Sequence, residues 1–276
     1  MDNKKNNNLP NKNIIGKQLV KRENNITQRR TILSSTAKNK NTFSKKEVSE
    51  DDKKKSDYTV YFAMEFYLKE KNIDTTLKIL EKAITLNPEN ASIYYNMGIV
   101  YSDINQIDKS MQSYEKCLSI DPNNQDARFN LANILTKTGF WEGALSHYEK
   151  IIEVDEMAFD AIYNIGFIYL RYLKDYQKAI TFFKKVIKYN PLNKEAFFNL
   201  ALSYYFIDDK EKAIEIYDDL LMIFPDYSMA VYNLASIHFQ LNRKDRAFNL
   251  FQKYLEMPKH ISEYNFVKIA KRKLRE

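Results

Sequence analysis

A two-residue motif, an aromatic residue followed by Asn, recurs along most of this chain at a nearly constant spacing. Successive copies are 34, 34, 35 and 34 residues apart, and each is followed by an apolar residue and then a small one. The copies are Tyr95-Asn96, Phe129-Asn130, Tyr163-Asn164, Phe198-Asn199 and Tyr232-Asn233. A period of this length is typical of helical repeat arrays. Because such arrays usually bind other proteins and rarely carry out chemistry, the spacing indicates how the protein works but not for which partner.

Composition divides the chain near residue 56. Residues 1–56 contain ten Asn and twelve Lys, and Phe43 is the only aromatic residue among them, out of 37 Tyr and Phe and one Trp in the chain. Their net charge is +9, whereas residues 57–276 have a net charge of −2. A segment this polar buries too little apolar surface to offset its ordering entropy. We therefore predict a disordered basic arm over 1–56 and a nearly neutral folded part beyond it.

Prolines divide the folded part into units. Pro88, Pro122, Pro191 and Pro225 each follow an apolar-rich segment and precede a new helical pattern, as expected of a residue that ends helices. The six units that result are 57–90, 91–124, 125–158, 159–193, 194–227 and 228–261. Within each unit apolar residues recur at helical spacing in two blocks. Small residues, such as Gly98 and Ala213, fall where two helices must approach closely.

These units resemble the tetratricopeptide repeat. The matching residues in the second unit are Tyr94, Gly98, Tyr101, Tyr114 and Pro122, and in the fifth unit Phe197, Ala201, Tyr204, Ala213, Tyr217 and Pro225. The resemblance covers about three quarters of the chain. It implies an all-α, right-handed superhelical solenoid of antiparallel helix pairs, with the first helix of each pair lining a concave groove.

Some positions depart from that pattern. Unit one has Phe62 where the others have Asn, and unit three ends in Glu156 instead of proline. Unit four carries one extra residue near 171–175, which predicts a longer turn or first helix.

The final residues, 262–276, are predicted to form a capping helix that begins at Ser262. Phe266, Ile269 and Ala270 would cover the open face of unit six, while five cationic side chains stay in water.

The first candidate binding site is the row of asparagines. Asn96, Asn130, Asn164, Asn199 and Asn233 would place one amide per repeat along the groove, and amides suit the backbone of an extended peptide. Some long superhelices of the resembled family, including the one that feeds an O-linked glycosyltransferase, have this arrangement. The alternative is that Tyr-Asn is common at this position of the repeat for structural reasons.

The second candidate is an apolar stretch on the first helices of units four to six. The repeat register places six side chains off the core face there: Phe167, Leu170, Leu202, Tyr205, Phe206 and Phe239. A contiguous exposed apolar patch usually binds a partner, such as an amphipathic helix. The alternative is that superhelix curvature or the C-terminal helix covers these side chains.

Several other functions have little support. Chaperone-binding members of the family hold a terminal carboxylate with Lys and Arg, but the equivalent positions here include Asp126, Asp160 and Glu195, which argues against such a partner. The three histidines are scattered, Cys117 is the only cysteine, and no glycine-rich phosphate loop occurs, so we expect no enzyme, metal or cofactor. The basic arm lacks interleaved aromatics, so we expect no specific nucleic-acid binding.

The sequence also lacks a stretch apolar enough to span a membrane, so we expect a cytoplasmic or nuclear protein. We predict a non-catalytic adaptor whose groove binds a peptide or amphipathic helix of another protein. The alternatives are an architectural subunit of a larger assembly and a substrate-recruiting subunit of an enzyme complex.

Overall fold

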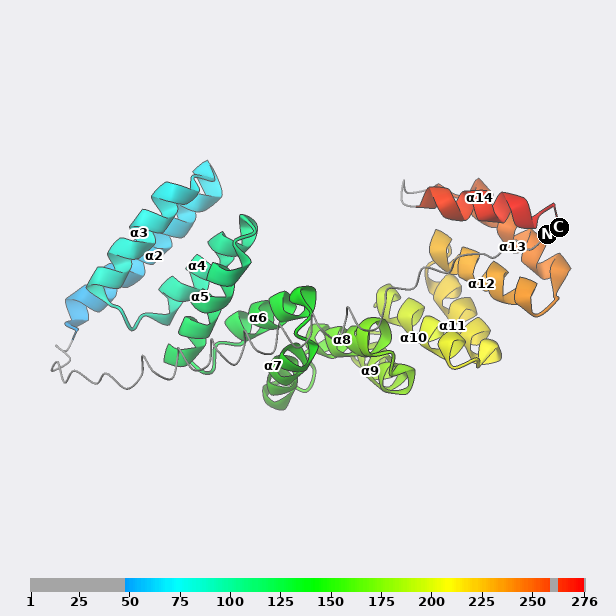
Figure 1. Cartoon of the computed structure of the whole chain (residues 1–276), viewed down its shortest axis with the longest axis horizontal. Helices are drawn as coiled ribbons and strands as arrows, with labels where there is room; N and C mark the ends of the chain where they lie inside the picture. Colours follow the sequence, from blue (N-terminus) through cyan, green and yellow to red (C-terminus); the bar gives the residue numbers. More distant parts are fainter. Residues whose placement is uncertain (1–47, 259–262, 276) are drawn as a thin grey trace, which may run out of the picture. The chain divides into compact units, whose positions relative to one another are not determined.

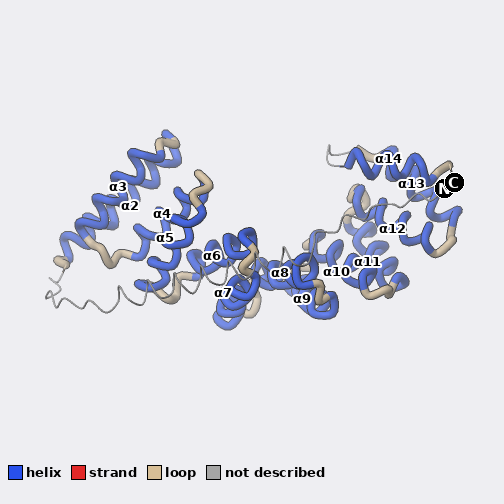
Figure 2. Tube along the Cα trace, viewed as in Figure 1, coloured by secondary structure: helices blue, strands red, loops and turns tan. Residues whose placement is uncertain are grey.

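The computed structural model describes residues 48–258 and 263–275 and contains thirteen α-helices and no strand within those ranges (Figure 1, Figure 2). The helices are α2 (Glu50–Glu70), α3 (Ile73–Leu86), α4 (Ala91–Asp103), α5 (Ile107–Ile120), α6 (Gln125–Thr138), α7 (Trp141–Val154), α8 (Phe159–Ile168), α9 (Tyr176–Tyr189), α10 (Lys194–Phe206), α11 (Lys210–Ile223), α12 (Ser228–Gln240), α13 (Lys244–Glu256) and α14 (Tyr264–Lys273). A short π-helical segment, η1 (Tyr169–Leu173), follows α8 directly. The prediction of an all-α array is confirmed.

Each of the six predicted units contains one helix pair, from α2 with α3 to α12 with α13, and α14 follows the last pair. Within a pair, the small residues lie where expected. Gly98 of α4 is buried directly against the ring of Tyr114 on α5, and Ser110 Oγ donates a hydrogen bond to the Gly98 carbonyl at 2.7 Å. This close approach of backbone to ring requires a position without a side chain.

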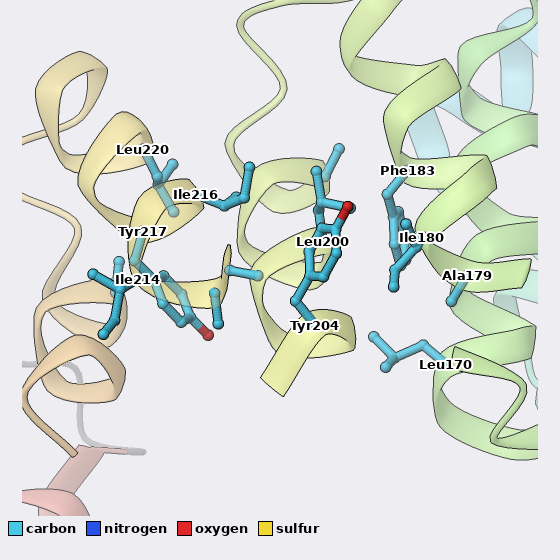
Figure 3. Packing of buried hydrophobic residues seen from close by; sticks show 14 of the residues in the cluster. Leu170, Ala179, Ile180, Phe183, Leu200, Tyr204, Ile214, Ile216, Tyr217 and Leu220 are labelled. Carbon is cyan, nitrogen blue, oxygen red and sulfur yellow. The ribbon is translucent and has the colours of Figure 1, made fainter. Parts of the chain in front are cut away.

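Neighbouring pairs share their cores, so no unit buries its apolar face alone. The buried cluster in units four to six joins residues of α9, α10, α11 and α12. Figure 3 shows Leu200 and Tyr204 of α10 between Phe183 of α9 and Tyr217 of α11. Further clusters join α2 and α3 to α4, α4 and α5 to α6, α6 and α7 to α8, and α12 and α13 to α14. The stability of this part of the chain therefore depends on stacking.

The turn between the two helices of a pair has the same backbone form in all six units. One residue in each turn adopts the left-handed conformation, and these residues recur at the repeat spacing: Lys71, Asn105, Gly139, Lys174, Asp208 and Asn242. The step from Gly139 to Lys174 is the one that is longer by a residue. There, the N–H of Asp175 bonds to the carbonyl six residues earlier, on Tyr169, whereas Asp209 N–H bonds to the carbonyl five residues earlier, on Tyr204. The predicted insertion is thus accommodated as a π-helical turn, the usual result of one added residue.

The predicted boundary of the N-terminal arm was wrong at its C-terminal side. Helix α2 begins at Glu50, and the Ser49 side chain caps it by accepting a hydrogen bond from the Asp52 N–H at 3.1 Å. Ser56 is buried and donates a hydrogen bond to the Ala83 carbonyl at 3.2 Å, so it belongs to the folded part. The remainder of the predicted arm, 1–47, lies outside the described residues.

The C-terminal helix covers the end of unit six, largely as predicted. Ala270 is fully buried, and the Phe266 ring packs edge-on against Tyr232 of α12 with 4.9 Å between ring centroids. Ile269 differs from the prediction because it is exposed, at 36% of its surface. The predicted capping residue, Ser262, lies outside the described residues, and α14 begins at Tyr264.

Candidate partner-binding surface

The asparagines of the recurring motif form hydrogen bonds between repeats. Asn199 Nδ2 donates to the Tyr163 hydroxyl of the preceding unit at 2.9 Å, and Asn233 Nδ2 donates to the Tyr217 hydroxyl of the preceding unit at the same distance. Asn164 Nδ2 likewise donates to the Tyr148 hydroxyl, at 3.1 Å.

The two asparagines nearer the N-terminus differ from these three. Burial raises the pKa of both Tyr95 and Tyr114, and the nearby amide of Asn130 in the next unit opposes part of that rise. Asn96 differs, because unit one has Leu80 at the position that a buried tyrosine occupies in units two, three and five. Its amide donates to the Ser92 carbonyl of its own helix at 2.8 Å. Three of the five amides therefore bridge neighbouring units by hydrogen bonds, a use that the sequence pattern did not reveal.

The six predicted apolar groove residues fall into four environments. Leu202, Tyr205 and Phe239 are partly buried and line one cavity together with Asn233. Phe206 is 44% exposed, and its ring stacks on Tyr176 at 4.9 Å, outside the cavity lining.

The remaining two lie in unit four. The half-buried Phe167 ring lies 6.1 Å from Tyr172 and 6.3 Å from Tyr163. The assignment of Leu170 to the groove was wrong: it is 2% exposed and packs in the core shared with Ala179 of α9 (Figure 3). Since the π-helical turn changes the angular position of each residue within it, Leu170 faces the second helix of its own pair.

The cavity has a volume of about 360 Å³ and is open to solvent on one side. First helices α10 and α12 supply Leu202, Tyr205 and Phe239, and the C-terminal helix supplies Ile269 and Lys273. The lining is mainly apolar, with a few polar groups at defined places, and the volume lies at the lower end of the range of small-ligand pockets. A cavity of this size suits one or two anchoring side chains of a partner.

Polar side chains of the cavity connect its helices through a hydrogen bond and a cation–π contact. Gln240 Nε2 donates to the Tyr205 hydroxyl at 2.8 Å, which joins α12 to α10 across the cavity. The Lys273 ammonium lies 4.1 Å from the centre of the Phe239 ring, which joins α14 to α12 by a cation–π contact. Burial raises the pKa of the Tyr217 hydroxyl, so this group at the cavity base stays protonated. The helices of units five and six and the C-terminal helix therefore build the site together.

Other predicted features are placed as follows. Cys117 is fully buried, and burial raises the pKa of its thiol to about 11. His238 is fully buried at the position usually held by tyrosine, and burial lowers its pKa.

Among the residues that the structure describes, no three His, Cys, Asp or Glu side chains gather as a metal site would require. No helix within 48–258 or 263–275 has the length and apolar character of a membrane span.

Comparison with known proteins identifies the fold. Four sequence models of the tetratricopeptide repeat match residues 91–124, 113–145, 170–228 and 209–260, and together they cover more than half of the chain. No curated protein sequence matches it. The chain belongs to the tetratricopeptide repeat proteins.

Solved structures of this fold include three that align with most of the described residues. The crystal structure of MamA is 25% identical, with 66% of this chain and 96% of that chain covered and a TM-score of 0.57. YrrB, described as a TPR protein with an unusual peptide-binding site, is 19% identical, with 70% and 97% covered and a TM-score of 0.58. PilF of Pseudomonas aeruginosa is 16% identical, with 80% and 99% covered and a TM-score of 0.61. The last two likenesses show the fold alone.

Proposed function

We propose that this protein is a non-catalytic adaptor that binds a peptide or helix of a partner protein at the cavity between α10, α12 and α14. The observation that supports this most strongly is the convergence of Leu202, Tyr205 and Phe239 on one open cavity of about 360 Å³. Leu202 and Tyr205 belong to unit five and Phe239 belongs to unit six, so the fold brings together side chains from two successive units. The peptide-binding site named for the similarly folded YrrB is consistent with such a role.

Apolar contact supplies most of the affinity in this proposal. Burying one apolar anchor of the partner contributes about 1.5–3 kcal/mol before ordering costs. Asn233 is the member of the asparagine row that lines the cavity, and its remaining N–H and carbonyl oxygen would bind the partner's backbone. The other four asparagines would extend this contact along the groove. The same contact would serve a subunit that recruits substrates to an enzyme.

A selection from a random peptide library on the full chain tests this proposal. The selected peptides are then measured by fluorescence anisotropy against Ser236→Phe, which fills the cavity. Ser236 lines the cavity and donates only to the carbonyl of Tyr232 in its own helix, at 2.8 Å, so no contact between helices is lost. Ser146→Phe is the matched control, because Ser146 is exposed on α7, away from the cavity.

We expect Ser236→Phe to weaken peptide binding by about tenfold to a hundredfold, the equivalent of one lost anchor. Ser146→Phe should leave the affinity unchanged. If no selected peptide distinguishes Ser236→Phe from the control, the cavity is not the binding site and the proposal is wrong.

A second candidate function, an architectural subunit, is favoured by the exposed face of α2. Tyr58, Tyr61, Phe62 and Leu68 lie on that helix with 48–71% of their surface exposed. Apolar surface at an open end of an array is what stacking with another array would need. Analytical ultracentrifugation over a range of concentrations tests it: an architectural role predicts self-association that Tyr61→Asp abolishes, and a monomer at all concentrations would rule out self-stacking through this face.

A further inference from the structure

Charge is distributed unevenly around the cavity. The C-terminal helix and the two residues after it, 264–275, contain Lys268, Lys271, Arg272, Lys273 and Arg275 and no acidic residue. The opposite wall, α12, contains no Asp, Glu, Lys or Arg. The open side of the cavity therefore has a neutral wall and a strongly basic wall.

The basic helix is fixed in place by its apolar face. Ala270 is buried in the cluster that α14 shares with α12 and α13, and Phe266 packs against it. An amphipathic helix that binds a membrane must present its apolar face to the lipid. Because this face of α14 is already packed against unit six, it is not available for insertion into a bilayer. Lys273 lines the cavity itself, and the other four cations line a second hollow on α14 that adjoins it at Ile269.

The cavity itself favours groups that accept hydrogen bonds. Tyr205 Oη accepts a hydrogen bond from Gln240, so its own proton is left to donate, since a phenol both donates and accepts. The Lys273 ammonium, above the Phe239 ring, is a cationic donor. A carboxylate bound here would receive charge-assisted hydrogen bonds, which are stronger than neutral ones.

The groove of units three to five has the opposite charge. Asp126, Asp160 and Glu195 occupy the same position on three successive first helices and are exposed. They would repel an acidic segment from those units, and like charges opposite each other are a common source of specificity. An acidic ligand is therefore directed to the C-terminal end of the array.

We propose that the ligand of the cavity is an acidic amphipathic segment of a partner protein, with an apolar anchor between α10 and α12 and Asp or Glu side chains against α14. This inference rests on the proposed function and specifies the chemistry of the partner. It predicts that binding weakens as the salt concentration rises, because cations of α14 such as Lys268 and Lys271 are exposed and salt screens exposed charges.

The test repeats the random-peptide selection on the full-length wild type and on two charge-reversal variants. Lys268→Glu with Lys271→Glu reverses two exposed cations of α14, and Lys78→Glu with Lys82→Glu reverses two exposed cations of α3 as a matched control. We expect the wild type and the control to enrich acidic peptides with apolar anchors. The α14 variant should enrich neutral or basic peptides and should bind the best wild-type peptide roughly tenfold more weakly. Circular dichroism would first establish equal helix content in all three proteins.

Other results would overturn the inference in distinguishable ways. Neutral or basic peptides selected by the wild type and blocked by Ser236→Phe would leave the adaptor function standing and refute the acidic ligand. Peptides that are insensitive to both Ser236→Phe and the α14 charges would refute both proposals. A third result would assign the basic helix to a membrane surface instead. In that case the full chain would co-sediment with phosphatidylserine vesicles, the α14 variant would not, and no acidic peptide would be enriched.

Discussion

The contact between Gly98 and the Tyr114 ring gives a prediction whose sign and size follow from the structure. A Cβ atom built on Gly98 would lie 2.6 Å from Cε1 and 2.8 Å from Cδ1 of Tyr114. Tyr114 is only 2% exposed and packs in the cluster shared by α4, α5 and α6, so its ring has no open space to move into. Overpacking of this kind costs about 1–3 kcal/mol.

Gly143 is the matched control, because a Cβ there would lie at an ordinary 3.5 Å from Leu135 Cδ1. Replacing glycine by alanine inside a helix stabilises the folded state by about 0.5–1 kcal/mol, and this gain applies to both variants. We therefore expect Gly143→Ala to be as stable as the wild type or more stable, and Gly98→Ala to be less stable than Gly143→Ala by about 1–3 kcal/mol.

Guanidinium unfolding followed by circular dichroism measures this difference in the free energy of unfolding. The comparison requires that the dependence of that free energy on guanidinium concentration is the same in all variants. The double variant Gly98→Ala/Tyr114→Leu serves as a further check, because removing the ring removes the clash and the two changes should not be additive. Equal stability of Gly98→Ala and Gly143→Ala would refute the assignment of Gly98 to close helix packing.

Three further predictions concern stability. Asn199→Ala should lower the free energy of unfolding by about 1 kcal/mol more than Asn96→Ala, because only Asn199 bonds to a tyrosine of the preceding repeat; equal losses in guanidinium unfolding would contradict this. Lys174→Gly should raise the melting temperature, since Lys174 has φ 56° and glycine relieves about 1 kcal/mol of strain there; an unchanged or lower value would contradict it. Burial raises the pKa of Tyr148 and Tyr227 from 10.0 to about 12, so their contribution to stability is complete below pH 10 and is lost as the pH rises through 12; circular dichroism should show helix loss in that window, and a helix content that stays unchanged above pH 12 would contradict this account.

The helix pairs and their packing faces could be predicted from the sequence because they depend on local pattern. Apolar residues at helical spacing, small residues at helix contacts and prolines between pairs all lie within one repeat length. The start of α2 depends on a different signal. Residues 50–55 are polar and largely exposed, and their part of the helix has the Ser49 cap and ion pairs such as Lys55 with Asp51 at 2.5 Å in place of apolar burial. A criterion based on apolar content therefore placed the boundary too late.

The misplaced groove residue shows how an insertion affects a repeat-based prediction. The register placed Leu170 in the groove by counting from the start of its unit. The added residue forms η1, and the π-helical turn brings Leu170 into the core. Counting gives the presence of an extra residue but not how the helix accommodates it, which depends on the packing of the neighbouring pairs.

The candidate site was predicted only in part for a related reason. Leu202, Tyr205 and Phe239 could be placed off the core face from the periodicity of α10 and α12. The docking of the C-terminal helix on unit six was predicted, but the contribution of Lys273 to the cavity was not, because the register of that docking is a tertiary contact outside the repeat pattern. The bonds between asparagine and tyrosine were missed for the same reason, since they cross from one unit to the next.

The most direct test of the central claim is to locate a bound peptide. A peptide selected on the full chain would carry a benzophenone at its apolar anchor, and photo-crosslinked products would be mapped by mass spectrometry. We predict crosslinks to α10, α12 and α14, concentrated near Leu202, Phe239 and Ile269, which line the cavity. Crosslinks concentrated on the second helices of the pairs, or on α2, would contradict the claim that this cavity is the binding site.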